Sequence, residues 1–111
     1  TKESLEKQLV IIDDLLGRFN NIRIDDKSVT FNTDLQEAIE LGHMIESSKI
    51  MVYGAINREE SRGGHYREDF TSRDDEKFLK HTYAYMDNDF NITHEWGEVV
   101  LEKFEPKERT Y

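Results

Sequence analysis

The chain has 111 residues, 35% of them charged and 36% hydrophobic, so it is about one domain long and too apolar to be disordered. Its formal net charge of −9 disfavours binding to nucleic acid or directly to an anionic membrane. The lack of cysteine excludes disulfides and iron–sulfur ligation by this chain, and apolar runs of four residues at most are too short to span a bilayer.

The first predicted element is an amphipathic helix over residues 2–19. Acidic residues lie in its first turn, Thr1 is placed to cap it, and Asn20 and Asn21 suit its end. Residues 22–31 predict an irregular connection. The apolar residues recur at spacings of three and four along one face: Leu5, Leu9, Ile12, Leu16 and Phe19.

A second, longer helix is predicted to begin at residues 32–34, where Thr33 and Gln36 have the spacing of a capping box. We expect Gly63 and Gly64 to end it in a left-handed conformation. Two apolar faces indicate a helix that packs between layers. The inner stripe is Leu35, Ala38, Ile39, Gly42, Ile45, Val52 and Ile56, and the second face is Leu41, Met44, Met51 and Ala55.

Residues 74–79 predict a helical turn, and three short strands are expected after it, over 82–86, 92–96 and 99–104, with a turn at 87–89. The fold class is therefore expected to be mainly α, with two helices followed by a short β-hairpin or small antiparallel sheet. Four aromatic residues of this region mark either an interface or a cover over the helices: Tyr83, Tyr85, Trp96 and Phe104.

The segment 58–76 is the most distinctive, because twelve of its nineteen residues are ionisable and it holds four of the seven arginines. A guanidinium group offers a planar pair of donors that matches a carboxylate, so interleaved Arg and Asp predict a loop whose turns are fixed by bidentate pairs. Two alternatives stay open. One is an anion or dicarboxylate site made by Arg62, His65 and Arg67, and the other is a docking surface for another domain or subunit.

Three stretches resemble the succinate dehydrogenase and fumarate reductase flavoprotein family. Residues 60–70 and 73–82 are similar to the family's E-S-R-G-x-H-x-R-x-D and R-D-D-x-x-x-L-K-H-T. Residues 25–28 and 31–41 resemble D-D-K-S and F-N-T-D-L-x-E-A-x-E-L. The ending, 104–111, resembles P-K-E-R-x-Y, so the chain is expected to reach the natural C-terminus. The resemblance covers essentially the whole chain in the right order.

The resemblance implies a C-terminal helical domain that packs against the FAD-binding domain of its own chain, beside an iron–sulfur subunit, in an enzyme interconverting succinate and fumarate. It implies FAD in the parent chain, and no catalytic, cofactor-binding or metal residue within these 111 residues. The implied location is cytoplasmic and peripheral on the inner face of the cell membrane through partner subunits, or the matrix face of a mitochondrion. The residues expected to be structural or interfacial are Ser61, Arg62, Gly63, His65, Arg67, Asp69, Arg73, Asp74, Asp75 and His81.

The resemblance implies a domain that begins with a further helix before residues 2–19, and we expect that helix to be missing from this chain. The expected architecture is thus a truncated three-helix, spectrin-repeat-like bundle with two helices present. We expect a helical hairpin over 1–61, and a loop with a β-hairpin extension over 62–111, within one domain. Uncovered apolar faces are expected to drive self-association of the isolated chain.

The residues themselves give no pattern for catalysis or metal binding. The histidines His43, His65, His81 and His94 lack metal-site spacing, no G-x-G-x-x-G occurs, and a Ser61–His65 pair has no third residue. The acid pairs 13–14 and 25–26 suit solvated surface.

Three alternatives to the dehydrogenase or reductase stay open. The first is the C-terminal domain of L-aspartate oxidase, which has a similar S-R-G-x-H motif, although the hairpin and the P-K-E-R-x-Y ending favour the dehydrogenase or reductase. The second is a stand-alone acidic protein-interaction module. The third is a small carboxylate-binding or catalytic protein that uses Arg62, His65 and Arg67.

Overall fold

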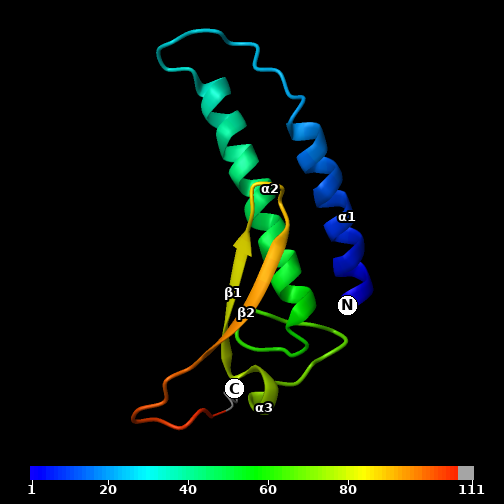
Figure 1. Ribbon diagram of the computed structural model, residues 1–111, viewed down its shortest axis with the longest axis vertical. Helices are drawn as coiled ribbons and strands as arrows, with labels where there is room; N and C mark the ends of the chain where they lie inside the picture. Colours follow the sequence, from blue (N-terminus) through cyan, green and yellow to red (C-terminus); the bar gives the residue numbers. More distant parts are fainter. Residues whose placement is uncertain (108–111) are drawn as a thin grey trace.

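The computed structural model describes residues 1–107 and holds two long helices, one short helix and a two-stranded sheet (Figure 1). The two long helices lie side by side and antiparallel, and the sheet packs against the second of them. This arrangement confirms the mainly α fold class with a small antiparallel sheet. In chain order the elements are α1 (Lys2–Phe19), α2 (Thr33–Asn57), α3 (Asp75–Phe78), β1 (Lys80–Met86) and β2 (Ile92–Glu98).

Helix α1 has the predicted bounds and the predicted cap. The Thr1 hydroxyl accepts a hydrogen bond from the backbone N–H of Ser4 at 3.4 Å, and the amino group of Thr1 donates to the Ser4 hydroxyl at 3.0 Å. Such a reciprocal cap satisfies donors that the first helical turn leaves free.

Helix α2 is capped by Asn32, not by the predicted pair of Thr33 and Gln36. The Asn32 side-chain oxygen accepts from the backbone N–H of Leu35 at 2.8 Å, whereas the Gln36 amide donates to Glu40 at 3.0 Å. Asparagine is as good a cap as any residue, and its position one residue earlier makes Thr33 the first helical residue. The helix start was therefore right and the capping residue wrong.

The expected helix end at Gly63 and Gly64 was also wrong. Helix α2 ends at Asn57, and Arg58 is already extended. Gly63 does adopt a left-handed conformation, with φ of +59°, but it uses it in a turn of the following loop.

The apolar core lies between α1 and α2 and is small. Its buried members are Ile12 and Leu16 of α1 and Ile45 of α2. Gly42 brings the two helices close, because a Cβ atom there would lie 2.7 Å from the Phe19 ring. The absence of a side chain at Gly42 thus permits the close approach of the two helices.

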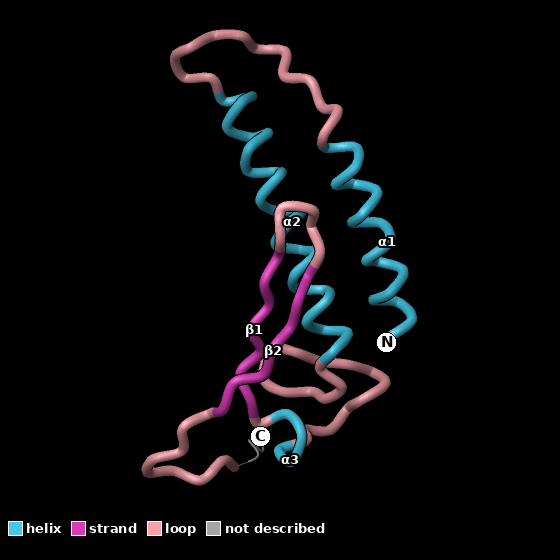
Figure 2. The backbone as a smooth tube through the Cα atoms, in the orientation of Figure 1, coloured by secondary structure: helices cyan, strands magenta, loops and turns pink. Residues whose placement is uncertain are grey.

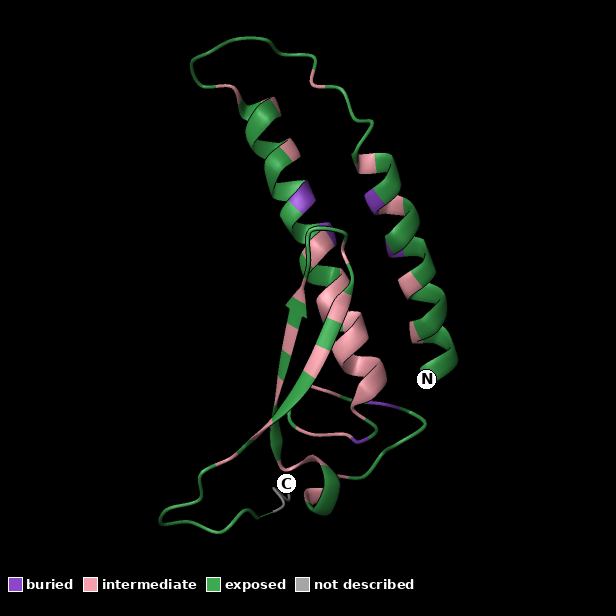
Figure 3. Ribbon diagram, in the orientation of Figure 1, coloured by how far each residue is buried: buried purple, intermediate pink, exposed green. Residues whose placement is uncertain are grey.

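The N-terminal end of α2 is exposed to solvent, so the first part of the predicted inner stripe is not buried. Leu35 and Ile39 are 43% and 50% exposed, because α2 has 25 residues against 18 in α1 and extends past it (Figure 3). The second predicted face is exposed at Leu41, Met44 and Met51. Within residues 1–107 no further long helix covers these faces, which agrees with the predicted truncated bundle.

The sheet is an antiparallel hairpin in which Lys80 pairs with Glu98 and Met86 with Ile92. Its turn is closed by the Asp87 carboxylate, which accepts two backbone N–H groups at 2.9 Å. Figure 2 shows the turn beside the middle of α2. There the Lys49 ammonium group donates to the Phe90 carbonyl oxygen at 2.8 Å. The same ammonium group lies 2.7 Å from the Asp13 carboxylate of α1, so one lysine joins the hairpin to both helices.

The third predicted strand, over residues 99–104, was wrong. Strand β2 ends at Glu98, and Val100, Leu101 and Phe104 are exposed in an irregular segment. Apolar and β-branched residues form a strand only where a neighbouring strand and a buried face exist. The part of the P-K-E-R-x-Y ending at 108–111 lies outside the described residues. Among residues 1–107 no helix has both the length and the apolar character needed to cross a membrane.

Candidate docking site: the arginine–carboxylate loop

The arginine–carboxylate loop, residues 58–75, comprises the connection from α2 to α3 and the first residue of α3, and it folds back on itself at the end of the two long helices (Figure 1). Its first turn is closed by paired backbone hydrogen bonds between Arg62 and His65, at 2.8 and 3.0 Å, with Gly63 at positive φ between them. The second turn is held by Ser61, whose hydroxyl accepts from the backbone N–H of Arg67 at 2.9 Å and donates to the Phe70 carbonyl oxygen at 2.7 Å.

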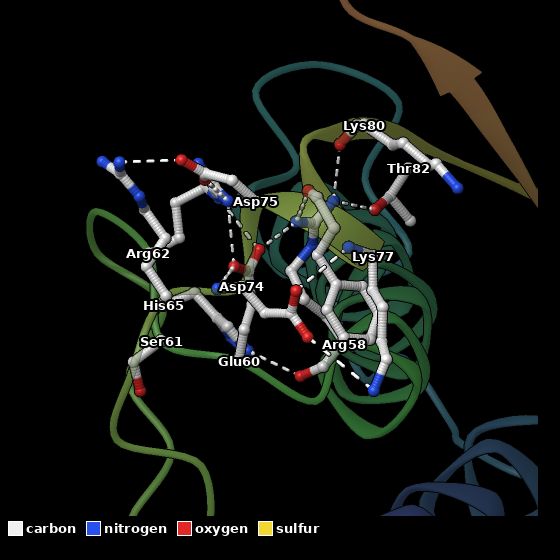
Figure 4. Close-up of polar contacts among 12 residues, drawn as sticks. Arg58, Glu60, Ser61, Arg62, His65, Asp74, Asp75, Lys77, Lys80 and Thr82 are labelled. Atoms are coloured by element: carbon white, nitrogen blue, oxygen red, sulfur yellow. Dashed lines mark hydrogen bonds and ion pairs between the residues drawn. The ribbon is translucent and has the colours of Figure 1, made fainter. Parts of the chain in front are cut away.

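Glu60 is the centre of the loop and has no exposed surface. One of its carboxylate oxygens accepts from Arg58 at 2.5 Å and from Arg62 at 2.9 Å. The other accepts from Arg62 at 3.0 Å and from the backbone N–H of Asp74 at 2.9 Å (Figure 4). A buried charge is tolerated only when it is paired and hydrogen-bonded, and this one has both kinds of partner.

The electrostatics of Glu60 favour its charged form. Burial alone would raise the pKa of this carboxyl group. The hydrogen bonds from Arg62, Asp74 and Arg58 and the positive charge of Arg62 outweigh burial and hold the pKa below its ordinary value. The loop therefore has an ionised carboxylate as its buried core.

Arg58 joins the loop to the sheet. Its guanidinium group donates to the carbonyl oxygens of Phe78 and Lys80, at 2.9 and 2.7 Å, and to the Thr82 hydroxyl at 2.9 Å. The Trp96 ring lies over it at 5.1 Å, a cation–π contact that shields the charge from water. Trp96 therefore covers the loop, whereas the exposed Tyr83 and Tyr85 lie on the other side of the hairpin, as the alternation along β1 requires.

Arg62 and Arg73 share the Asp75 carboxylate. Arg62 donates to one oxygen at 2.6 Å and Arg73 to the other at 2.8 Å. These two cations lower the pKa of the Asp75 carboxyl group, with the hydrogen bond from Arg62 as the largest cause. The second amino group of Arg73 donates to the Lys107 carbonyl oxygen at 2.9 Å, which ties the C-terminal segment to the loop.

Arg67 caps the C-terminal end of α2. It is 2% exposed, and one amino group donates to the carbonyl oxygens of Ala55 and Ile56 at 3.0 and 2.9 Å. These are carbonyl groups that a helix end leaves free, and a cation there is favoured by the helix dipole. The rest of the guanidinium group forms a bidentate pair with Asp69, at 2.9 and 2.6 Å.

Asp69 in turn connects the loop to the start of α1. Its carboxylate accepts from the backbone N–H of Lys2 at 2.8 Å, a contact between residues 67 positions apart. The hydrogen bonds from Arg67 hold the pKa of the Asp69 carboxyl group well below its ordinary value, against the opposing effect of burial. One arginine–aspartate pair thus fastens the ends of both long helices.

The remaining predicted residues divide into two groups. Nε2 of His65 is 3.1 Å from the Arg58 carbonyl oxygen and Asp74 caps α3 by accepting from Lys77 at 3.0 Å, so both belong to the loop. His81 does not join them. Its ring lies 6.3 Å from the Tyr83 ring on the exposed side of the hairpin.

The loop can hold chain segments together, but it offers no vacant cation for a substrate. Each of its four arginines donates to a carboxylate or a carbonyl oxygen of the chain. Within residues 1–107 no group of three or more histidine, aspartate and glutamate side chains is arranged to hold a metal ion. The geometry therefore disfavours the anion site of Arg62, His65 and Arg67.

The sequence predicted bidentate arginine–carboxylate pairs. It did not predict that Glu60 and Arg58 lie at the centre of the network. A signal was present, because Arg58, Glu60 and Arg62 are spaced by two residues. In extended backbone this spacing places side chains on one side of the chain, and two arginines there converge on one carboxylate.

The chain is similar to known flavoprotein subunits over its full length. The family model described as "Fumarate reductase flavoprotein C-term" matches residues 1–111. The fumarate reductase flavoprotein subunit of a Serratia strain is 42% identical over 100% of the chain. The mitochondrial succinate dehydrogenase [ubiquinone] flavoprotein subunit of Oryza sativa is 37% identical over 100% of it. The chain spans 19% of the length of each of these two relatives.

A solved structure has the same fold. The FrdA chain of Escherichia coli quinol fumarate reductase superposes with a TM-score of 0.90 and 40% sequence identity. The match covers 97% of this chain and 19% of the FrdA chain.

Proposed function

The chain belongs to the fumarate reductase flavoprotein C-terminal family, and we propose that it is the non-catalytic docking domain of an FAD-dependent enzyme that interconverts succinate and fumarate. The observation that carries the proposal is the full-length match to a family whose members are about five times longer. The arginine–carboxylate loop supports the proposal, because its arginines are all paired with groups of the chain. Such pairing holds chain segments together and leaves no arginine free to bind a substrate.

The parent protein would carry FAD in its earlier domains and pass electrons to an iron–sulfur subunit. Its partner subunits would hold it at the inner face of the cell membrane, or at the matrix face in a mitochondrion. The FAD would supply the redox chemistry. The residues of this chain would fix the position of the domain.

Within the chain we assign two parts. Residues 1–61 form the helical hairpin, and residues 62–111 hold the rest of the loop and the β-hairpin extension. The predicted structural residues from Ser61 to Asp75 hold these parts together, because their hydrogen bonds reach α1, α2, α3 and the C-terminal segment. His81, on the outer side of the hairpin, is assigned to an interface.

The α1/α2 groove, an apolar furrow of about 280 Å³, supports docking on the rest of the parent. Leu15, Phe19, Ile22, Leu41 and Ile45 line it. Without the parent we expect copies of the chain to associate through this groove and the exposed face of α2 beside it, which carries Leu41, Met44 and Met51, because contiguous apolar surface is rarely left in water. Light scattering that reports a monomer over a wide concentration range would rule out this self-association.

The alternatives are weaker. The relatives named above are fumarate reductases and succinate dehydrogenases, which favours these enzymes over L-aspartate oxidase. A small carboxylate-binding protein would need free cations, and Arg67 is buried and fully paired. A stand-alone interaction module predicts a native protein with about the 13.2 kDa mass of this chain.

Capture of the native protein tests the proposal. An antibody raised against this chain is used to isolate the protein, and its mass and flavin content are measured. We expect a flavin-bearing polypeptide several times larger than 13.2 kDa. A flavin-free species of about that mass would overturn the proposal and favour the interaction module.

A further inference from the structure

The outer face of the β-hairpin, here named the tyrosine face, is turned away from α2. Its residues alternate along both strands with those that pack on the helix, as Figure 3 shows by the alternating exposed and half-buried segments. No residue of the tyrosine face lines the α1/α2 groove, so the two surfaces are separate. The members of the tyrosine face are His81, Tyr83 and Tyr85 of β1 and Thr93 and Glu95 of β2.

Tyr83 is the central side chain of the tyrosine face, and its ring lies over Gly97 of β2. A Cβ atom at position 97 would lie 2.3 Å from the ring, so the ring occupies space that any other residue would fill. In the antiparallel register Tyr83 pairs directly with Glu95. Side chains in such a pair have their Cβ atoms about 5 Å apart. The ring and the carboxylate are therefore neighbours, and the ring stays 47% exposed.

Glu95 has no positively charged neighbour to balance it. Among residues 1–107 no ion pair includes this exposed carboxylate. The whole chain carries a formal net charge of −9. An aromatic ring attracts a cation to its face, and a carboxylate beside the ring adds a direct attraction between opposite charges. The tyrosine face therefore has the chemistry to bind a cationic group.

The same combination of ring and carboxylate occurs twice within the chain, and an arginine occupies it each time. The guanidinium carbon lies 5.1 Å from the ring centroid in one case and 4.8 Å in the other. On the tyrosine face the ring and the carboxylate are present without the cation. The two internal sets are Arg58 with Trp96 and Glu60, and Arg67 with Phe70 and Asp69.

We propose that the tyrosine face binds an arginine or lysine side chain of another subunit of the parent enzyme, held between the Tyr83 and Tyr85 rings and the Glu95 carboxylate. The inference rests on the proposed function, because the relatives are named as subunits and therefore have partner chains. Tyrosine and arginine are both enriched where subunits meet. The α1/α2 groove, which is apolar, is left for the parent polypeptide itself.

Photo-crosslinking in the native complex of the full-length polypeptide tests the proposal. Tyr85, which is 54% exposed, is replaced by p-benzoylphenylalanine, and Val10 on α1 receives the same replacement to report non-specific links. Cross-linked peptides are identified by mass spectrometry. We expect Tyr85 to link to a peptide of a different polypeptide, with an arginine or lysine within a few residues of the link, and Val10 to give no link to that peptide.

Charge reversal provides a second measurement. Glu95→Lys places a cation where we propose that a cation binds, so the Kd between the full-length polypeptide and the other subunits should rise by about tenfold or more. Glu37→Lys makes the same change of charge at an exposed position of α2 and should leave the Kd unchanged. Replacing the cross-linked arginine or lysine of the partner by glutamate should restore binding to the Glu95→Lys variant. Biolayer interferometry measures each Kd.

The position of the Tyr83 ring can be tested separately. Gly97→Ala would displace the ring from its place on β2, and Tyr83→Leu removes the ring while keeping an apolar side chain. We expect each to raise the same Kd by about threefold to tenfold, because a cation–π contact is lost. Circular dichroism of each variant should match that of the parent protein.

The outcomes separate this inference from the proposed function. Links from Tyr85 only within its own polypeptide, no link at all, or an unchanged Kd for Glu95→Lys would each overturn the inference, even where the polypeptide carries flavin. A link to a cationic segment of a partner by a polypeptide that lacks flavin would support the tyrosine face and contradict the enzymatic proposal.

Discussion

The arginine–carboxylate loop and the α1–α2 pair are held by opposite means. The loop buries the charged side chains of Glu60 and Arg67, and it satisfies them with groups of its own chain. The helical pair buries only Ile12, Leu16 and Ile45 and leaves many apolar side chains in solvent. Hydrogen bonds and ion pairs can all be satisfied within a short segment, whereas an apolar helix face is buried only when another element packs against it. The loop is therefore complete by itself and the helical pair is not.

Removal of the Glu60 carboxylate should cause the largest loss of stability in the loop. Glu60→Ala leaves Arg58 and Arg62 without their buried counter-charge, so we expect a loss of about 3–5 kcal/mol in the free energy of unfolding. Urea unfolding followed by circular dichroism measures it. Glu59→Gln, at the exposed neighbouring position, serves as the control and should change stability by less than about 0.5 kcal/mol. Equal effects of the two variants would show that the network does not hold the fold.

Acid should weaken the loop before it affects the helical pair. The pKa values of Glu60, Asp69 and Asp75 lie below their ordinary values of 4.5, 3.8 and 3.8. Their stabilising contribution is therefore fully present above those ordinary values and is lost as pH falls through the lowered ones. We expect thermal midpoints that are constant near neutral pH and fall below about pH 4. Glu60→Gln should flatten part of this dependence, and a midpoint that rises on acidification would contradict the ionised network.

Arg62→Ala is expected to cost less than Glu60→Ala. The substitution leaves Glu60 with Arg58 and the Asp74 N–H, and leaves Asp75 with Arg73. We expect a loss of about 1–3 kcal/mol because a buried acceptor loses one partner. Differential scanning calorimetry measures it. An unchanged melting temperature would mean that Arg62 contributes nothing in the isolated chain and acts only with a partner present.

How well each region could be predicted follows from the range of the interactions involved. The bounds of α1 were predicted because its cap and its periodicity are local. The exposure of Leu35 and Ile39 was not predicted, because periodicity identifies an apolar stripe but not the length of the helix that packs against it. Residues 99–104 have strand propensity but no neighbouring strand. Glu60 emerged as the centre only when folding brought Asp74 to it from fourteen positions away.

The helical pair can be tested with two glycines of α2. Gly42→Ala would place a Cβ atom 2.7 Å from the Phe19 ring, so we expect a loss of about 1 kcal/mol or more from overpacking. Gly54→Ala is the matched control, because apart from the adjacent backbone of α2 no atom lies within 4 Å of the added Cβ. Alanine there should stabilise by about 0.5–1 kcal/mol through helix propensity. Chemical denaturation gives both values, and equal signs would contradict the close approach at Gly42.

The smallest change in stability is expected on the uncovered face of α2. Met44→Ser and Met51→Ser remove exposed side chains that contribute to no core, so the free energy of unfolding should change by less than about 0.5 kcal/mol. Association between copies should nevertheless weaken, because it depends on the same side chains. Sedimentation velocity across a range of concentrations measures the association, and calorimetry of the same samples measures stability. Weaker association at constant stability would show that this face serves contacts beyond the chain, whereas a large loss of stability would mean that the helical pair is already complete.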